Sequence, residues 1–222
     1  GKFDMDSGEL ISADKSFSSV FGDKLCKLAE NDKKICAITA AMTLGTGLSQ
    51  FSKKYKDRFF DVGIAEEHAV TFACGLATKG IIPVFAVYST FLQRSFDQML
   101  HDAAMQKLHM VLAIDRAGVV GDDGETHQGL FDVPMLNAIP ETTIFSPCYF
   151  DELENSLFAS IYMCEGLAAV RYPRGKELYK PNDFKGSSIN FSLYGNSECK
   201  NIIVTYGRLF SYACKAKEIL KK

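Results

Sequence analysis

Two adjacent glutamates and a histidine open an otherwise apolar stretch, DVGIAEEHAVTFACG, at residues 61 to 75. In a helix that begins just before the glutamates, Glu66 lies on one line with Val70, whereas Glu67 lies on one line with Thr71. We therefore expect Glu66 to face the core. Burial there would favour the protonated carboxylic acid and allow it to share a proton with a heterocycle nitrogen. The alternative is that both acids only complement the positive end of the helix dipole.

Further polar and aromatic side chains follow later strand-like runs of the sequence. Arginines, with a planar and permanently charged guanidinium, suit a phosphate or carboxylate on a small substrate. An aspartate and a histidine on the glycine-broken loop GVVGDDGETHQG could orient a hydroxyl and move a proton near neutral pH. The groups are Tyr88, Phe91 and Arg94 after IPVFAVY, Arg116, Asp123 and His127 after MVLAID, and Arg174 after LAAVRY.

Each of these groups also has an ordinary structural interpretation. An isolated arginine is usually a surface residue, and a loop rich in glycine and aspartate is usually a solvated turn. The acids and the histidine of the loop could instead bind a metal, but their spacing fits neither a calcium loop nor a zinc-binding helix. Tyr88 and Phe91 could simply belong to the core. The convergence of all the groups on one edge of a sheet favours a functional site over these separate interpretations.

The elements that must position these groups alternate along the chain. Short β-branched and aromatic runs, several of them apolar throughout, alternate with longer segments of helical period. This pattern predicts an α/β fold with a doubly wound, mostly parallel sheet and helices on both faces. Such sheets bind ligands at the carboxyl ends of their strands. The expected strands span residues 35–39, 59–62, 82–88, 110–115, 142–145 and 167–172, and the expected helices 16–29, 48–55, 66–79, 91–107 and 150–163.

The last part of the chain has a different character. Residues 173 to 200 are rich in glycine, proline, lysine, asparagine and serine, which predicts a long connection with a short hairpin in it. A further strand, NIIVTY at 201 to 206, leads through Gly207 into a last helix. One strand and one helix cannot bury a core of their own. We expect them to add to the main sheet or to begin another domain.

The composition of the 222 residues is that of an ordinary soluble globular protein. The formal net charge is −2 and the basic residues are scattered, so nothing favours nucleic acid or an anionic membrane surface as a partner. No apolar stretch is long enough to span a bilayer. The seven cysteines form no CxxC pair, which fits reduced thiols in the cytoplasm better than a disulfide framework.

Three segments of the sequence, in order, resemble the central domain of the 1-deoxy-D-xylulose-5-phosphate synthases, a transketolase-like domain that binds a pyrimidine ring. They are DVGIAEEHAVTFACGLA, the run from PVFAVYSTFLQR to DGETHQGLFD, and AVRYPRG. The resemblance extends over nearly the whole chain. YSTFLQR and DGETHQG separate this family from the transketolases and from the 2-oxoacid dehydrogenase β chains.

The resemblance implies a thiamine diphosphate enzyme, a transferase that condenses pyruvate with glyceraldehyde 3-phosphate to 1-deoxy-D-xylulose 5-phosphate and carbon dioxide. This product feeds the synthesis of isoprenoids by the non-mevalonate route, of thiamine and of pyridoxal. By this resemblance Glu66 hydrogen-bonds the pyrimidine ring of the cofactor and exchanges a proton with it, and Phe91 and Ile64 are further cofactor contacts. His127 and Asp123 would be catalytic groups that act on the donor, the intermediate or the acceptor hydroxyl. The substrate-binding residues would be Tyr88, Arg94, Arg116 and Arg174, of which Arg116 and Arg174 chiefly hold the acceptor phosphate.

The sequence departs from the family pattern in several places. Glu67 stands where the family commonly has glutamine and Ala40 where it commonly has proline. The amino-terminal domain, whose Gly-Asp-Gly motif holds magnesium and the diphosphate, has no counterpart in these residues. We therefore expect a fragment of a longer, homodimeric and cytoplasmic enzyme, inactive without the amino-terminal domain. Its parts would be the pyrimidine-binding domain at 1–180, a linker with a short hairpin at 181–200, and the first strand and helix of a carboxyl-terminal domain at 201–222.

The residues leave two alternatives open. The chain could belong to another thiamine diphosphate enzyme, of the transketolase or 2-oxoacid dehydrogenase E1β type, with a different donor and acceptor. It could also be a non-catalytic binding module that kept the fold without the chemistry. The presence of Glu66, which such a module could lose without penalty to folding, argues against the second alternative.

Overall fold

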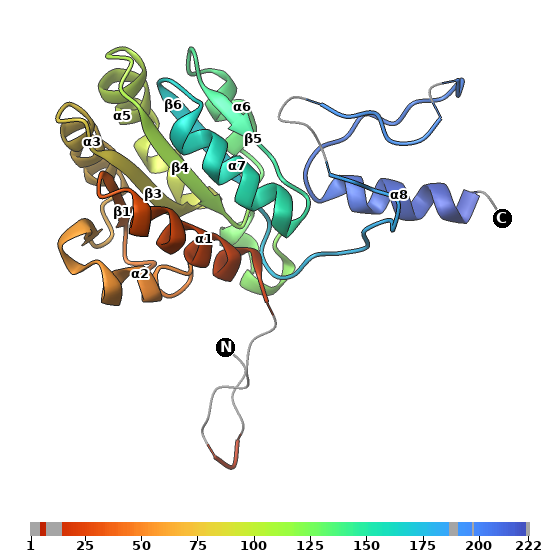
Figure 1. The fold of residues 1–222 in the computed structure, drawn as a ribbon, viewed down its shortest axis with the longest axis horizontal. Coiled ribbons are helices and arrows are strands. Elements are labelled where there is room, and N and C mark those ends of the chain that lie inside the picture. The colour runs from red at the N-terminus through yellow and green to blue at the C-terminus, as the bar shows by residue number, and fades with distance from the viewer. Residues whose placement is uncertain (1–4, 8–14, 187–190, 197, 221–222) are drawn as a thin grey trace.

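A parallel β-sheet forms the body of the protein (Figure 1). The computed structural model describes residues 5–7, 15–186, 191–196 and 198–220. The six strands lie in the order β2-β1-β3-β4-β6-β5, and all of them pair in parallel. This confirms the predicted α/β fold. The strands are β1 (Ile35–Thr39), β2 (Phe59–Asp61), β3 (Ile82–Tyr88), β4 (Met110–Asp115), β5 (Thr143–Phe145) and β6 (Leu167–Arg171).

The central strands are apolar throughout because helices cover both faces of the sheet. Every residue of β1, β4 and β6 is buried. Successive side chains of a strand point to opposite faces, so Val84 packs into one core cluster and its neighbour Phe85 into the other. The register of the strands places Val84 opposite Val111 and Phe85 opposite Leu112, which continues each apolar row across the sheet.

The helices divide into two layers. The core cluster on one face contains side chains of α1, α2 and α7, and the cluster on the other face contains side chains of α3, α4, α6 and η3. A capping box between Ser16 and Ser19 fixes the start of α1. The helices are α1 (Phe17–Asn31), α2 (Ser49–Lys54), α3 (Glu66–Ala77), α4 (Ser89–Leu92), α5 (Phe96–Gln98), α6 (Asp132–Asn137), α7 (Phe150–Tyr162) and α8 (Leu209–Leu220), with shorter turns η1 (Lys56–Arg58), η2 (Gln93–Ser95), η3 (Met99–Ala104), η4 (Gly121–Asp123) and η5 (Glu125–His127).

The prediction of one continuous helix over residues 91–107 is wrong. The segment begins at Ser89 and is divided into α4, η2, α5 and the π-helical turn η3. The break lies at Ser95, whose backbone leaves the helical region at φ −108°, ψ 20°. The Ser95 hydroxyl donates to the carbonyl of Leu92 at 2.8 Å, and such a side-chain bond competes with the helical ladder. Periodicity alone does not reveal this competition.

The carboxyl-terminal segment differs from its prediction in one element. Residues 201–206 form no strand, because nothing in the described part of the chain pairs with them. Their apolar side chains are consequently exposed, Val204 by 93%. The expected hairpin in 181–200 forms no ladder among the described residues, and residues 187–190 and 197 lie outside them. The last helix is present as α8, while the division of the chain at residues 180 and 200 stays a prediction.

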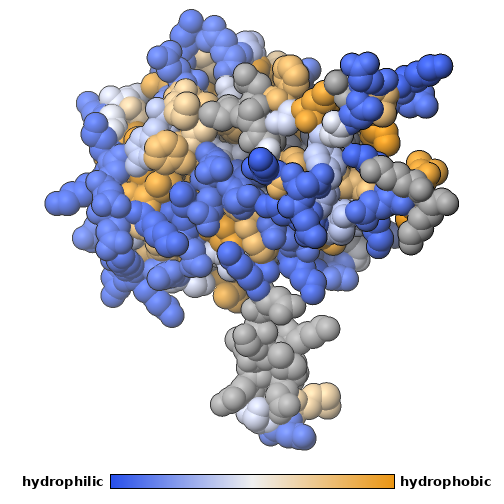
Figure 2. Space-filling view, turned by 45° about the vertical axis from the view of Figure 1, so that its right-hand side comes forward, coloured by the Kyte–Doolittle hydropathy of each residue, from blue (hydrophilic) through white to orange (hydrophobic). Residues whose placement is uncertain are grey.

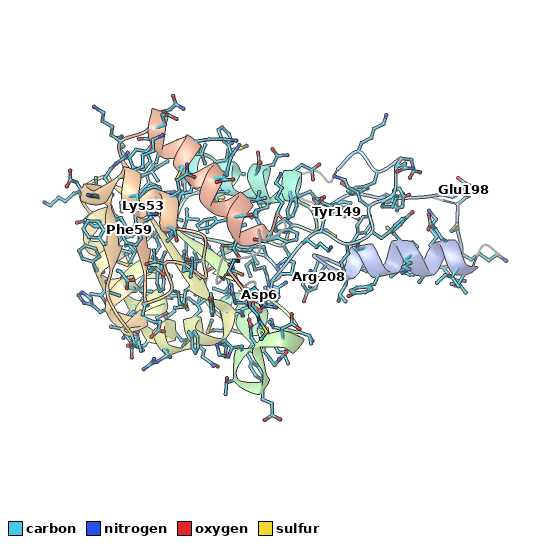
Figure 3. The ribbon with its side chains drawn as sticks, turned by 90° about the horizontal axis from the view of Figure 1, so that it is seen from below. Asp6, Lys53, Phe59, Tyr149, Glu198 and Arg208 are labelled. Carbon is cyan, nitrogen blue, oxygen red and sulfur yellow. The ribbon has the colours of Figure 1, made fainter. Side chains whose placement is uncertain are left out.

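Helix α8 lies beside the body of the protein and is tied to it near residues 149 and 208 (Figure 3). The Tyr149 hydroxyl donates to the carbonyl of Tyr179 at 3.0 Å, and the Tyr149 ring packs against Phe210. The Arg208 guanidinium donates to the carbonyl of Arg174 at 2.9 Å. Hydrophilic residues cover most of the visible surface in Figure 2. Among the described residues, no helix is both long and apolar enough to cross a membrane.

Candidate active site

The predicted site residues gather at the carboxyl edge of the sheet. Because all strands are parallel, the segments that follow β2, β3, β4 and β6 emerge on the same edge. They are the start of α3, the start of α4, the loop of residues 116–131, and residues 172–175. The sheet thus brings together side chains that are far apart in the sequence.

Glu66 occupies the first turn of α3 with its side chain inside the protein. It is 2% exposed, and Val70 on the same line is fully buried, whereas Glu67 is only half-buried. The prediction that the helical spacing separates the two acids is therefore confirmed. Residue 65, which caps the helix, provides no side-chain cap, so the positive end of the helix dipole lies close to both carboxylates.

The buried carboxylate of Glu66 is balanced by Arg94 from η2. Arg94 Nη1 lies 3.1 Å from Glu66 Oε2, and the arginine side chain is 46% exposed. The contact neutralises charge but lacks hydrogen-bond geometry, since Oε2 has no hydrogen-bond partner among the described residues. A buried oxygen of this kind is costly unless another group donates to it. Glu66 Oε2 is therefore a ready acceptor for a donor on a ligand.

Three aromatic rings form the centre of the site. Tyr88 and Phe91 are stacked with their ring centroids 6.0 Å apart, and the His127 ring stands edge-on to Phe91 at 5.3 Å. Burial raises the pKa of Tyr88, so its hydroxyl stays protonated and can donate a hydrogen bond at neutral pH. Stacked rings of this kind offer a flat apolar surface to a heterocycle.

Two arginines meet at one carboxylate of the loop. Arg116 Nε lies 3.3 Å from Asp123 Oδ2, and Arg174 Nε lies 3.2 Å from the same oxygen. Arg174 also donates from Nη1 to Asp122 at 2.5 Å. Because one oxygen contacts both guanidinium groups, a single small dianion could also contact both. The two arginines thus lie close together, while their action on one phosphate stays a prediction.

Hydrogen bonds hold the loop that carries these groups, although residues 121, 122 and 124–126 at its tip are exposed. Gly118 and Gly129 exchange two backbone hydrogen bonds of 2.8 Å at its base. The Gln128 amide spans the interior, donating to the Val120 carbonyl and accepting from the Val120 N–H, each at 2.8 Å. Thr90 of α4 donates to the Thr126 carbonyl at 3.0 Å, which fixes His127 beside the aromatic rings.

The predicted residues do not form one contact network. Ile64 is 75% exposed and has no ring or polar contact with the others, so its role stays a prediction. Arg94 forms an ion pair with Glu66, whereas the other two arginines form ion pairs with Asp123. Asp123 contacts arginines and His127 contacts aromatic rings, and no hydrogen bond joins these two residues within the described part of the chain.

Sequence reasoning missed a buried polar layer beneath Arg116. Asp115 is fully buried at the end of β4 and accepts a hydrogen bond of 2.6 Å from the hydroxyl of Ser18 in α1. Gly45 contributes its carbonyl to Arg116 Nη1 at 2.9 Å. The signal that could have revealed this layer is an aspartate that closes an otherwise apolar strand, MVLAID.

Comparison with known proteins places the chain and its fold in a family. The family model of the transketolase pyrimidine-binding domain matches residues 13–178. A 1-deoxy-D-xylulose-5-phosphate synthase of Clostridium kluyveri is 48% identical over 227 residues, covering 100% of this chain and 36% of the relative. The synthase of Clostridium acetobutylicum is 56% identical over 176 residues, covering 79% of this chain and 28% of the relative. The chain thus spans about a third of the length of these curated relatives.

Solved structures agree on the architecture. A transketolase of Pichia stipitis in complex with sedoheptulose 7-phosphate superimposes with a TM-score of 0.80 at 16% identity, covering 95% of this chain and 33% of that chain. A split-gene transketolase, described as an inactive β4 tetramer, has a TM-score of 0.64 at 26% identity and covers 75% of this chain and 55% of that chain. The first of these likenesses concerns the fold alone.

Proposed function

Because this chain belongs to the transketolase pyrimidine-binding domain family, we propose that it binds the aminopyrimidine ring of thiamine diphosphate as part of a synthase. The reaction would condense pyruvate with glyceraldehyde 3-phosphate to 1-deoxy-D-xylulose 5-phosphate and carbon dioxide. The named relatives support this reaction, since they are called 1-deoxy-D-xylulose-5-phosphate synthases and are about half identical in sequence.

The observation that carries the proposal is the buried oxygen of Glu66. Oε2 lies in the core without a hydrogen-bond partner among the described residues, at the start of a helix and next to a cation. A structural glutamate would be expected to have its oxygens satisfied. A ring nitrogen that can carry a proton would satisfy Oε2, and the Phe91 ring would stack on the same heterocycle. The residues present therefore fit an aminopyrimidine.

Glu66, Tyr88 and His127 have roles in the proposed reaction. When bound, thiamine diphosphate supplies the carbon nucleophile and the electron sink for decarboxylation. Glu66 accepts a hydrogen bond from the ring and exchanges a proton with it at Oε2. The Tyr88 hydroxyl donates a hydrogen bond to the substrates, and the His127 imidazole moves a proton between its own ring nitrogen and a substrate oxygen.

The acceptor phosphate would be held by the two arginines at the edge of the sheet. Arg116 and Arg174 both contact Oδ2 of Asp123, at 3.3 and 3.2 Å, so the two guanidinium groups are close enough together for one phosphate to contact both. Arg94 would contribute charge near the cofactor end through its pair with Glu66. The proposal includes magnesium bound by another domain, a homodimeric enzyme and a cytoplasmic location, which the family resemblance implies.

A transketolase-type reaction is the alternative proposal. It would use a ketose phosphate as donor, and the split-gene transketolase at 26% identity is the relative that favours it. Assays of the complete parent protein separate the two. Loss of pyruvate that depends on added glyceraldehyde 3-phosphate supports the synthase, and cleavage of a ketose phosphate without pyruvate supports the transketolase.

The neighbouring glutamates provide a matched test of the site. In the complete parent protein, we expect Glu66→Gln to lower kcat by at least about a hundredfold, since proton transfer by a positioned group contributes on the order of 10²–10⁴. Glu67→Gln changes the same charge on the same helix turn and should keep near-normal turnover. Circular dichroism checks that both variants fold. Unchanged turnover of folded Glu66→Gln would refute the role of Glu66 and favour a non-catalytic module.

A further inference from the structure

The backbone of Arg116 adopts a conformation that arginine rarely takes. Its φ angle is +59°, in the left-handed region that is strained for a residue with a Cβ atom. Tyr172 fixes the backbone before and after Arg116. Its N–H donates to the Ile114 carbonyl at 2.9 Å, and its carbonyl accepts from the Ala117 N–H at 3.0 Å. The strain is therefore imposed by the pairing of β4 with the chain that follows β6.

Asp115 provides the bonds that hold this strained residue. Its Oδ1 accepts the backbone N–H of Arg116 at 2.7 Å and lies 3.1 Å from Arg116 Nη1, so one oxygen fixes both ends of the arginine. Its other oxygen accepts the Ser18 hydroxyl at 2.6 Å. A fully buried carboxylate is stable only with such partners. Burial raises the pKa of Asp115 to about 6, while Arg116 and Ser18 act against this rise.

The guanidinium of Arg116 is consequently fixed from several sides. It lies over the Tyr88 ring, with Cζ 3.8 Å from the ring centroid. Nη1 donates to the Gly45 carbonyl at 2.9 Å, and Nε points to Asp123 at 3.3 Å. Among the described residues, Nη2 has no hydrogen bond or ion pair. It is the nitrogen left to bind an anion.

We infer that Asp115, supported by Ser18, is a positioning residue that holds the Arg116 guanidinium in the orientation in which it binds the phosphate of the acceptor substrate. The inference rests on the proposed function, because it assigns Arg116 to that phosphate. It adds a residue that does not touch the substrate and that lies beneath the site. Loss of Asp115 should thus weaken the use of a phosphorylated acceptor more than the use of the same aldehyde without phosphate.

The test compares two acceptors in the complete parent enzyme, glyceraldehyde 3-phosphate and D-glyceraldehyde. For Asp115→Asn, we expect the KM for the phosphorylated aldehyde to rise about tenfold, the size of one lost charge-assisted interaction. The KM for D-glyceraldehyde should change less than about twofold. Ser18→Ala, the milder change, should raise the same KM a few-fold, and Asp115→Asn should add little in an Arg116→Ala background.

Asp132→Asn is the matched control. Asp132 is another buried aspartate bound to an arginine, since Arg171 Nε donates to it at 2.8 Å, but among the described residues no hydrogen bond or ion pair joins it to Arg116. It should leave the preference for the phosphorylated acceptor unchanged.

Each outcome decides something. If Asp115→Asn and Ser18→Ala both keep the wild-type preference for glyceraldehyde 3-phosphate over D-glyceraldehyde, the inference is overturned and the proposed function stays intact. If Asp115→Asn does not fold, Ser18→Ala decides alone. A parent enzyme that uses neither acceptor with pyruvate would refute the proposed function and, with it, this inference.

Discussion

Replacing Asp115 with asparagine should change how the stability of the fold depends on pH. Asp115 is completely buried, and burial raises the pKa of its carboxyl from 3.8 to about 6. Between these pH values the folded chain holds a proton that the unfolded chain releases. The stability that comes with the protonated form is complete below pH 3.8 and is lost as the pH rises through about 6.

The size of this effect follows from the same two values. The rise of the pKa from 3.8 to about 6 corresponds to roughly 3 kcal/mol in the free energy of unfolding, at about 1.4 kcal/mol per pKa unit. Solvent does not screen this carboxyl, because it is fully buried. Asparagine has no charge at any pH, so the stability of the Asp115→Asn variant lacks this dependence on pH. The difference in unfolding free energy, wild type minus Asp115→Asn, should therefore fall by roughly 2 kcal/mol between pH 4 and pH 7, less than the full effect because the unfolded carboxyl is still partly protonated at pH 4.

Urea denaturation of both chains at several pH values, followed by circular dichroism, measures this difference. The comparison cancels other carboxyls, including Asp61, whose pKa is lowered because hydrogen bonds from Ala41, Thr43 and Gly63 outweigh the effect of burial. A difference that stays constant with pH, or rises with it, would refute the reasoning. It would mean that Asp115 is charged at little cost and that Arg116 and Ser18 compensate for its burial completely.

Three further predictions concern packing and buried charge. Gly129→Ala should destabilise the fold by about 1–3 kcal/mol, because a Cβ there would lie 2.2 Å from the Arg116 carbonyl oxygen. Gly75→Ala, in helix α3 with open space around it, should stabilise the fold by about 0.5–1 kcal/mol. Melting temperatures from calorimetry that equal that of the wild type would contradict both of these predictions. Asp132→Ala should cost roughly 3–5 kcal/mol in urea denaturation, because it leaves the Arg171 charge buried without its partner, and a loss below about 1 kcal/mol would show that water reaches that arginine.

The strands of this protein could be predicted from the sequence to within a residue. Strands 35–39, 82–88 and 110–115 have the predicted bounds, since each is a short run of mostly apolar residues, as is typical of a buried strand. The separation of Glu66 from Glu67 was equally predictable, because helical spacing decides which side chain faces the core. In both cases the information lies within one turn or one strand of the chain.

Two features of the fold could not be predicted from periodicity. The break at Ser95 depends on a side chain that competes with the helical ladder. The strand expected at 201–206 needs a partner strand, and no described residue supplies one. An extended segment becomes a strand only when another strand accepts its hydrogen bonds.

The candidate site also has features that could be predicted from the sequence and features that could not. The sequence by itself determined which residue types follow the strands, and therefore that carboxylates, arginines and aromatic rings would meet at one edge of the sheet. Only the tertiary structure decided that Arg116 and Arg174 share one carboxylate, and that Ser18 reaches Asp115 across 97 positions of sequence. The physical reason is that periodicity records which face of its own element a side chain occupies, whereas its hydrogen-bond partner depends on how the elements pack.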